Sequence, residues 1–247
     1  MSGLPDAATL AFLLDVDGTL LDIAPTPQSV QVPDSLLRHL QQLAKLTGGA
    51  TALVSGRSLR DLDRLFGPAQ LALVGGHGAE LRLWRDGAAE EQRAAPLDDW
   101  IRQRCSEVAS ADKNILMEDK GYSIALHYRL APEWEQAMKD AAEEILEQAP
   151  EEELEILHGK AVVEIKRAGL NKGRGIRRLM AQAPFSGRRP VYIGDDVTDE
   201  DAFAVMPEFE GVALSVGRTV DGAERRFERP EDVREWIARI CRGASSQ

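Results

Sequence analysis

Two short apolar runs that end at acidic residues constrain the fold of this chain most strongly. LAFLL (10–14) stops at Asp15, and PVYI (190–193) leads into Asp195 and Asp196. A run that is apolar at every position, and not at alternate positions, is typical of a parallel strand buried on both faces. Because neighbouring parallel strands need crossover connections, which are usually helices, we predict an α/β fold.

The segments around these runs alternate between strands and helices. We predict a helix that begins at Pro33 and ends before Gly48, and a second, shorter helix that Ser58 caps. Further strands are predicted at 50–54 and 71–74. A regular alternation of this kind implies parallel pairing with right-handed crossovers.

The pattern changes in the middle of the chain. There we predict two helices, at 96–109 and 132–148, and two β-hairpins, at 115–129 and 154–166. The order helix, hairpin, helix, hairpin is typical of an antiparallel sheet with two helices. It differs from the pattern on either side, so we interpret this block as an inserted module.

The α/β pattern returns with a helix that starts at about Lys172. We therefore predict two domains, which a chain of 247 residues can accommodate. The first is a doubly wound parallel sheet core formed by residues 1–96 and 168–247. The second is an inserted α+β cap domain formed by residues 97–167.

The charge of the chain limits its partners. Its 30 basic and 41 acidic residues give a net charge of -11. Nucleic acids and anionic membranes require a basic surface, so we expect neither as a partner. The N-terminus lacks the features of a signal peptide, and no apolar run approaches the roughly 20 residues that span a bilayer. We expect a monomeric, cytoplasmic protein whose two cysteines, Cys105 and Cys241, stay reduced.

Chemically reactive side chains follow the predicted strands at the point where each strand ends. Ligands of open α/β sheets bind at these carboxyl ends. If the strands are neighbours, the reactive groups converge on one edge of the sheet. These groups are Asp15 and Asp17, Ser55 and Arg57, Asp195 and Asp196, and Lys172 at the start of its helix.

The convergence of carboxylates points to a metal ion. Without a cation they raise one another's pKa and destabilise the fold. Mg²⁺ removes this cost, and it is typically held by one or two carboxylates together with a substrate phosphate. We therefore predict a Mg²⁺ site at this edge, with Ser55, Arg57 and Lys172 as ligands of the phosphate. An aspartate there can attack phosphorus, and a second acid can protonate the leaving oxygen and then activate water.

Each motif also has a purely structural explanation. An Asp-x-Asp or Ser-Gly sequence after a strand is common in turns. The acids at 199–201 also suit the first turn of a helix, where negative charge is favourable. Lys172 is also consistent with a solvated lysine. The order of the four motifs, each at a strand end or a helix start, favours the catalytic interpretation.

The four motifs, in this order, resemble those of the haloacid dehalogenase (HAD) phosphohydrolases. They are DVDGTLLD (15–22), SGR (55–57), Lys172 and GDDVTDEDAF (194–203). Four further segments are similar to the trehalose-6-phosphate phosphatase family, namely GGHGAE (75–80), EDKGYSIALHYR (118–129), GKAVVEIK (159–166) and NKG (171–173). The resemblance covers nearly the whole chain and implies a HAD-like core with a cap.

The resemblance implies a Mg²⁺-dependent phosphatase that hydrolyses trehalose 6-phosphate through an aspartyl-phosphate intermediate. It implies that Asp15 is the nucleophile and that Asp17 is the general acid and base. It further implies that Ser55 and Lys172 hold the transferred phosphoryl group, and that Arg57 supports the loop of Ser55.

The resemblance also implies the metal ligands. Asp15 and Asp195 are expected to bind Mg²⁺ through their side chains, and Asp17 through its backbone carbonyl. Asp196 is expected to bind the metal directly or through water. Asp199 is expected beside these ligands and not among them.

In the predicted cap, the resemblance implies that Glu118, Lys120, Lys160 and Glu164 recognise the sugar. Glu118 and Lys120 alternate onto one strand face, as do Lys160 and Glu164. Such a mixture of donors and acceptors suits a sugar with many hydroxyl groups, although these residues are also consistent with solvated charges. His77 either helps to close the pocket or is an ordinary histidine of a turn.

One segment departs from the family pattern, and other functions stay open. EIKRAG (164–169) lacks the Arg-Pro that commonly follows the glutamate of the second hairpin, so the alignment over 166–170 is loose. A sucrose-phosphate phosphatase or a sugar phosphomutase of the same superfamily also fits the motifs. A phosphoryl-accepting receiver module, which is not an enzyme, fits less well because receivers are shorter and have no cap.

Overall fold

The structure, a computed structural model, describes residues 7–23, 30–85, 87–150, 153–159 and 161–244. The chain divides into two compact units. We call Met1–Gln92 together with Asn171–Gln247 the core unit, and Arg93–Leu170 the inserted unit. Each unit has its own hydrophobic core.

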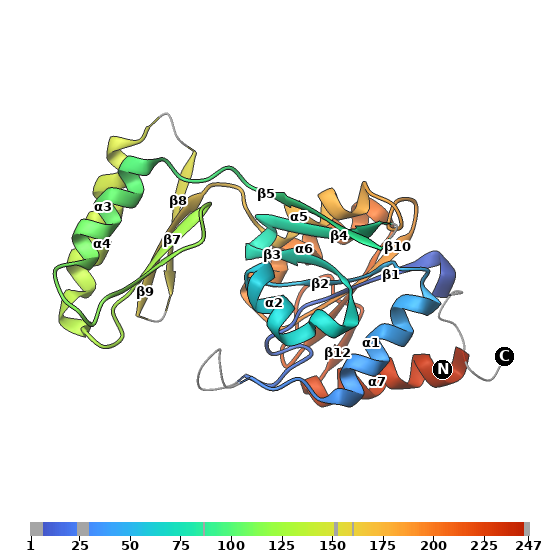
Figure 1. The fold of residues 1–247 in the computed structure, drawn as a ribbon. Coiled ribbons are helices and arrows are strands. Elements are labelled where there is room, and N and C mark those ends of the chain that lie inside the picture. The colour runs from blue at the N-terminus through green and yellow to red at the C-terminus, as the bar shows by residue number, and fades with distance from the viewer. Residues whose placement is uncertain (1–6, 24–29, 86, 151–152, 160, 245–247) are drawn as a thin grey trace. The chain divides into compact units, whose positions relative to one another are not determined.

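An eight-stranded sheet runs through the core unit (Figure 1). Its strands are β1 (Leu10–Leu14), β2 (Thr51–Val54), β3 (Ala72–Gly75), β4 (Glu80–Arg85), β5 (Ala88–Arg93), β10 (Arg189–Gly194), β11 (Val212–Val216) and β12 (Arg225–Phe227). They lie in the order β12-β11-β10-β1-β2-β3-β4-β5. Pairing is parallel from β12 to β3 and antiparallel between β3 and β4. Every residue of β1 is buried, as its apolar run predicts.

Helices cover both faces of this sheet, which confirms the predicted doubly wound fold (Figure 1). They are α1 (Asp34–Leu46), α2 (Leu59–Phe66), α5 (Lys172–Met180), α6 (Glu200–Val205) and α7 (Pro230–Ala244). Phe12 and Leu14 of β1 pack with α1, α2 and α7, whereas Ala11 and Leu13 pack with α5 and α6. None of the described helices has the length and the apolar character needed to cross a membrane.

Short 3-10 helices connect several of these elements in both units. They span Ala7–Thr9, Gly67–Ala69, Gly76–Gly78, Pro132–Trp134, Val197–Asp199 and Met206–Phe209. One of them, Gly76–Gly78, directly follows β3, and another, Val197–Asp199, follows β10 after Asp195 and Asp196. They turn the chain at the edge where the acidic motifs lie.

Local signals in the sequence placed the ends of the predicted elements to within about three residues. The hydroxyl of Ser58 accepts from the backbone N–H of Asp61 at 3.2 Å, which confirms the predicted cap of α2. Helix α1 begins one residue later than predicted, because Pro33 is its N-cap. The β4–β5 hairpin was not predicted. Since β5 is exposed at every position, it lacks the apolar alternation by which strands are recognised.

The inserted unit is an antiparallel sheet with two helices packed on one face. Its elements are α3 (Asp99–Ala109), β6 (Leu116–Asp119), β7 (Ser123–His127), α4 (Glu135–Gln148), β8 (Leu154–Gly159) and β9 (Val162–Arg167). The strands lie in the order β6-β7-β9-β8. Ile124 and Val163 of the sheet pack with Ile101 of α3 and Met138 of α4. The succession of helices and hairpins agrees with the predicted one.

Candidate active site

Three acidic side chains meet at the carboxyl edge of the core sheet. Asp15 follows β1, Asp195 follows the neighbouring β10, and Asp199 ends the 3-10 helix after it. Each offers a carboxylate oxygen, and these oxygens lie within 4.8 Å of one another. Asp15 and Asp199 are buried, and Asp195 is partly buried. The pairing of β1 with β10 therefore brings the first and the last acidic motif together.

Lys172 places a positive charge within this group. Its Nζ donates to Asp15 Oδ1 at 2.7 Å and to Asp199 Oδ1 at 2.6 Å, and its side chain is 3% exposed. It is the first residue of α5, which Asn171 caps by accepting from the N–H of Arg174 at 2.8 Å. An ammonium group has three N–H donors, so two bonds fix its position and one donor stays available for a ligand.

The carboxylate of Asp199 is filled by donors from the protein itself. Oδ1 accepts from Lys172 and from the hydroxyl of Tyr192. Oδ2 accepts from the backbone N–H groups of Asp195 and Asp196, each at 2.9 Å. Because each oxygen already has two donors, Asp199 is poorly placed to bind a metal despite its proximity. Asp15 and Asp195 are the better ligands.

The charges in this cluster shift one another's protonation. Burial raises the pKa of Asp15 to about 8; Lys172 counteracts this rise, and Asp199 adds to it. Burial also raises the pKa of Asp195, although a hydrogen bond from Thr19 opposes it. For Lys172, burial favours the neutral form, but the two carboxylates outweigh it and raise its pKa. A divalent cation would favour the ionised forms of Asp15 and Asp195, so this set of oxygen donors fits a hard metal.

Asp17 is held by Arg57 and not by the acidic cluster. The guanidinium donates from Nε to Oδ2 and from Nη2 to Oδ1, both at 2.6 Å. The Arg57 side chain is 11% exposed and that of Asp17 38%. The backbone N–H of Arg57 also donates to the hydroxyl oxygen of Ser55 at 3.2 Å. The first and second motifs are therefore joined, and Asp17 is the more accessible member of the pair.

His77 and Glu80 support the loop that carries Ser55. The imidazole of His77 lies against Gly56, where a Cβ atom would come within 2.4 Å of Nε2. The backbone N–H of His77 donates to the carbonyl of Ser55 at 3.1 Å. The buried carboxylate of Glu80 accepts from the N–H of Leu59, the first residue of α2, at 2.8 Å. Glu80 was not among the predicted site residues, although it ends the GGHGAE segment.

Two further residues, Gly18 and Thr19, lie in the loop that follows Asp15, and both approach the carboxylate of Asp195. Gly18 has a φ of +81°, and a Cβ atom there would lie 2.0 Å from Asp195 Oδ2. The hydroxyl of Thr19 donates to Asp195 Oδ1 at 3.0 Å. Only glycine fits at position 18, because a side chain would displace the carboxylate of Asp195.

Asp196 lies outside the group of acids that meet. It is exposed, and its Oδ1 accepts from the N–H of Val197 at 2.7 Å, where it caps the 3-10 helix. In this conformation Asp196 organises the turn after β10. Its predicted role as a metal ligand, directly or through water, stays a prediction.

A row of side chains crosses the face of the inserted unit opposite its helices. Glu118 of β6 pairs with Ala125 of β7, which pairs with Glu164 of β9, which pairs with Leu157 of β8. Because alternate residues of a strand share a face, these four lie opposite the apolar face that packs on α3 and α4. The small side chain of Ala125 separates the two glutamates. We call this row the glutamate row.

Polar side chains surround the glutamate row. Lys120 Nζ lies 3.3 Å from Glu164 Oε1, which also accepts from the hydroxyl of Ser123 at 2.6 Å. His127 Nε2 lies 3.3 Å from Glu118 Oε2, and this hydrogen bond lowers the pKa of Glu118. The structure thus brings Glu118, Lys120 and Glu164 together. The fourth predicted residue of this set, Lys160, lies outside the described residues.

Sequence patterns did not single out Tyr192, Thr19, Ser123 or His127 as parts of either site. Tyr192 carried the clearest signal, because it is a hydroxyl group within an apolar strand. Ser123 and His127 alternate with Ala125 along β7 and therefore lie on the same face as the glutamate row. The alternation of residues in the predicted strand could have shown this.

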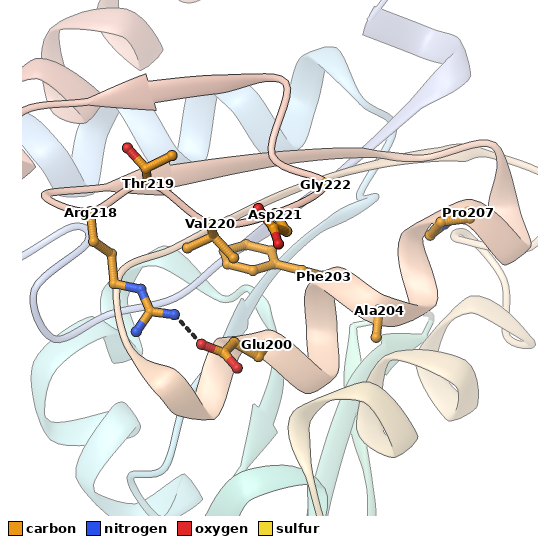
Figure 2. Close-up of a pocket in the computed structure, with 9 residues that line it drawn as sticks. All are labelled: Glu200, Phe203, Ala204, Pro207, Arg218, Thr219, Val220, Asp221 and Gly222. Atoms are coloured by element: carbon orange, nitrogen blue, oxygen red, sulfur yellow. Dashed lines mark hydrogen bonds and ion pairs between the residues drawn. The ribbon is translucent and has the colours of Figure 1, made fainter.

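A cavity of about 480 Å³ lies elsewhere in the core unit, between α6 and the loop after β11 (Figure 2). An ion pair between Arg218 and Glu200 borders it, and Phe203 and Val220 form part of its wall. Among the described residues, those that line this cavity differ from the predicted site residues. The acidic cluster, and not this cavity, is therefore the candidate active site.

Known proteins resemble the chain in sequence. Residues 13–229 match the family model described as trehalose-phosphatase. A probable trehalose-phosphate phosphatase of Sinorhizobium fredii is 42% identical over 240 residues, which cover 96% of this chain and 89% of that protein. The trehalose-6-phosphate phosphatase of Escherichia coli is 40% identical over 238 residues, which cover 95% of this chain and 87% of that protein.

Solved structures resemble the chain in fold. A structure described as a trehalose-6-phosphate phosphatase related protein has a TM-score of 0.74 and 23% identity, and the match covers 96% of this chain and 100% of that chain. A haloacid dehalogenase-like hydrolase from Bacteroides thetaiotaomicron has a TM-score of 0.69 and 15% identity, with 94% and 99% covered. Both identities are low, so these structures show the fold alone.

Proposed function

Because this chain belongs to the trehalose-phosphatase family, we propose that the cluster around Lys172 is where it hydrolyses trehalose 6-phosphate to trehalose and phosphate. The observation that carries this assignment is the buried Lys172, bonded to both Asp15 and Asp199 beside Asp195. A fixed lysine between acids at the carboxyl edge of a doubly wound sheet suits the binding and transfer of a phosphoryl group.

Asp15 is the proposed nucleophile. Its Oδ1 is held by Lys172, which leaves the other oxygen to attack phosphorus. In the first step an Asp15–phosphorus bond forms, the bond from phosphorus to the sugar oxygen breaks, and Asp17, which enters this step protonated, gives that oxygen its proton. In the second step Asp17 takes a proton from water, the water oxygen attacks phosphorus, and the Asp15–phosphorus bond breaks. Trehalose and phosphate leave, and both aspartates return to their initial state.

Two side chains are proposed to hold the phosphoryl group during these steps. Lys172 has one N–H donor beyond its bonds to Asp15 and Asp199. The hydroxyl oxygen of Ser55 accepts from the backbone of Arg57, so its own O–H can point to a phosphate oxygen. Donors that are already fixed before the substrate arrives need little reorganisation in the transition state.

Mg²⁺ is the proposed cofactor of this site. Asp15 and Asp195 would hold it through carboxylate oxygens and Asp17 through its backbone carbonyl, with Asp196 as a direct or water-mediated ligand. The raised pKa values of the buried Asp15 and the partly buried Asp195 support the fit, because a cation would let the two carboxylates ionise together. When bound, Mg²⁺ would neutralise phosphate oxygens and so reduce their repulsion of an attacking carboxylate.

We assign recognition of the sugar to the glutamate row of the inserted unit. Glu118 and Glu164 offer acceptors to sugar hydroxyls, and Lys120 offers donors. Arg57 is assigned to Asp17 more than to the substrate, and His77 to the loop of Ser55. Two expectations, a monomeric state and a cytoplasmic location, stay predictions.

The proposal is tested by phosphate release from a panel of sugar phosphates. With Mg²⁺ present, trehalose 6-phosphate should react far faster than glucose 6-phosphate or sucrose 6-phosphate, and chelation by EDTA should abolish all turnover. A preference for sucrose 6-phosphate would favour the related sucrose phosphatase. Transfer of phosphate within one sugar, without release, would favour a mutase.

A further inference from the structure

Tyr192 is a buried hydroxyl group within an otherwise apolar strand. It is 0% exposed, and its neighbours in β10 from Pro190 to Gly194 are apolar. A phenylalanine would fill the same space without a polar atom. Burying a hydroxyl group is costly unless it makes a hydrogen bond, so a buried tyrosine in such a strand is expected to have a bonding partner.

The hydroxyl of Tyr192 donates to Oδ1 of Asp199, the same oxygen that binds Lys172 at 2.6 Å. The other oxygen of Asp199 accepts from the backbone of Asp195 and Asp196. Of these four donors, Lys172 has a role of its own in the proposed chemistry, whereas the hydroxyl of Tyr192 has none. It completes the set that fixes the rotation of the Asp199 carboxylate.

The ring of Tyr192 is itself held from α6. Phe203 meets it edge to face, with ring centroids 5.5 Å apart and an interplanar angle of 72°. Phe203 in turn lies beneath the loop after β11, next to Val220 (Figure 2). Tyr192 is thus fully buried and packed against Phe203, with its hydroxyl bonded to Asp199.

We propose that Tyr192 is a positioning residue for phosphoryl transfer, which acts on Lys172 through Asp199. The proposal rests on the function proposed above for Lys172. Lys172 is shared between Asp15 and Asp199 at nearly equal distances, 2.7 and 2.6 Å. Without the tyrosine hydroxyl, Oδ1 of Asp199 would lose one of its two donors and draw the ammonium group closer. Lys172 would then move away from Asp15 and from the phosphoryl group.

The substitution Tyr192→Phe tests this role, because it removes the hydroxyl and keeps the ring. We expect kcat to fall about 10- to 100-fold, the range typical of residues that orient a reacting group. KM should stay within about threefold, since the sugar contacts are untouched. The fall should be equal for trehalose 6-phosphate and a small aryl phosphate, because both depend on Lys172. Tyr128→Phe, the same change in the core of the inserted unit, should leave both parameters unchanged.

A second variant separates positioning from packing. Phe203→Leu loosens the ring of Tyr192 but keeps its hydroxyl, so it should lower Tm more than Tyr192→Phe and lower kcat less. Tyr192→Phe with wild-type kcat would overturn the proposal. So would a pair of variants whose loss of kcat simply follows their loss of Tm. Asp15→Asn separates the proposed role of Tyr192 from the proposed function of the acidic cluster. If Asp15→Asn is inactive while Tyr192→Phe has normal activity, only the role of Tyr192 fails.

Discussion

Arg57 holds Asp17 with both arms of its guanidinium, from Nε to Oδ2 and from Nη2 to Oδ1, each at 2.6 Å. A paired contact of this geometry fixes the carboxylate in rotation as well as in position. Desolvation of Arg57 opposes this pairing, yet the hydrogen bonds to Asp17 prevail and raise the pKa of the arginine. The proposed acid and base is thus oriented before any substrate binds.

The first prediction concerns this pair. Arg57→Lys keeps the positive charge but cannot form two parallel bonds, so Asp17 should lose its fixed orientation. We expect kcat to fall about 10- to 100-fold for trehalose 6-phosphate and for an aryl phosphate alike. Steady-state kinetics with both substrates measure this. The control is Arg64→Lys, an exposed arginine of α2 paired with Asp61 at 3.2 Å, which should remain fully active. Normal activity of Arg57→Lys would show that charge alone suffices.

The position of Arg57 shows how far the sequence predicts the site. Strand ends predicted that Asp15, Asp17, Arg57 and Asp195 share one edge, because parallel strands place their carboxyl ends together. Which acid Arg57 binds depends on side-chain geometry between residues 40 positions apart, to which no local pattern is sensitive. Arg57 was therefore assigned to the phosphate from the sequence, whereas the structure pairs it with Asp17.

In the fold, too, local features can be predicted from the sequence, whereas contacts that depend on packing cannot. The buried strand β1 and the capped helix α2 follow from runs and caps that are local in sequence. The β4–β5 hairpin does not, because its outer strand is exposed and has no apolar period. The bond between Tyr192 and Asp199 needs a strand and the turn after it to fold back on each other. Interactions of this kind appear only once the elements are packed.

The second prediction concerns the nucleophile. Asp15→Asn keeps the shape of the side chain but replaces the attacking oxygen, so turnover should fall by about 10⁴-fold or more. Binding of trehalose 6-phosphate, measured by calorimetry with Mg²⁺ present, should largely survive because Ser55 and Lys172 remain. Asp22→Asn, an exposed aspartate of the same segment, is the control and should be active. Residual turnover of Asp15→Asn above about one thousandth would assign the attack to another group.

The third prediction concerns the cost of the acidic cluster. Burial raises the folded-state pKa of Asp195 above its unfolded value. Stability associated with the neutral form is therefore complete below the unfolded pKa of about 3.9 and is lost as pH rises through the folded pKa. Asp195→Asn avoids this loss. In EDTA at pH 7.5 its Tm should exceed that of the wild type by roughly 2–4 °C, a modest gain because water still reaches part of the carboxylate.

Two measurements check this third prediction. Thermal unfolding in EDTA should show the Tm advantage shrinking as the pH falls below the unfolded pKa of about 3.9, because Asp195 then becomes neutral in both states. Activity should show the opposite order, because Asp195→Asn loses a charged ligand and should need at least about tenfold more Mg²⁺ for half-maximal turnover. A lower Tm for the variant at pH 7.5 in EDTA would mean that the carboxylate stabilises the fold through its bond from Thr19.

The last prediction concerns the glutamate row, whose effect on activity can be measured separately from that of the acidic cluster. Glu118 and Glu164 lie on the inserted unit, one on each side of Ala125, whereas the acids of the proposed chemistry all lie on the core unit. Contacts with the sugar should lower the barrier for trehalose 6-phosphate only. A small aryl phosphate has no disaccharide to be recognised, so its hydrolysis should depend on the core unit alone.

Glu118→Gln and Glu164→Gln should each lower kcat/KM for trehalose 6-phosphate about 10- to 100-fold, because each removes a charged acceptor of sugar hydroxyls. Hydrolysis of the aryl phosphate should stay within about twofold. Glu107→Gln, an exposed glutamate of α3 in the same unit, is the matched control and should change neither rate. If both substrates slow equally, the glutamates support the fold through Lys120, Ser123 and His127. In that case sugar recognition lies elsewhere, since a residue that reads the disaccharide cannot slow a substrate without one.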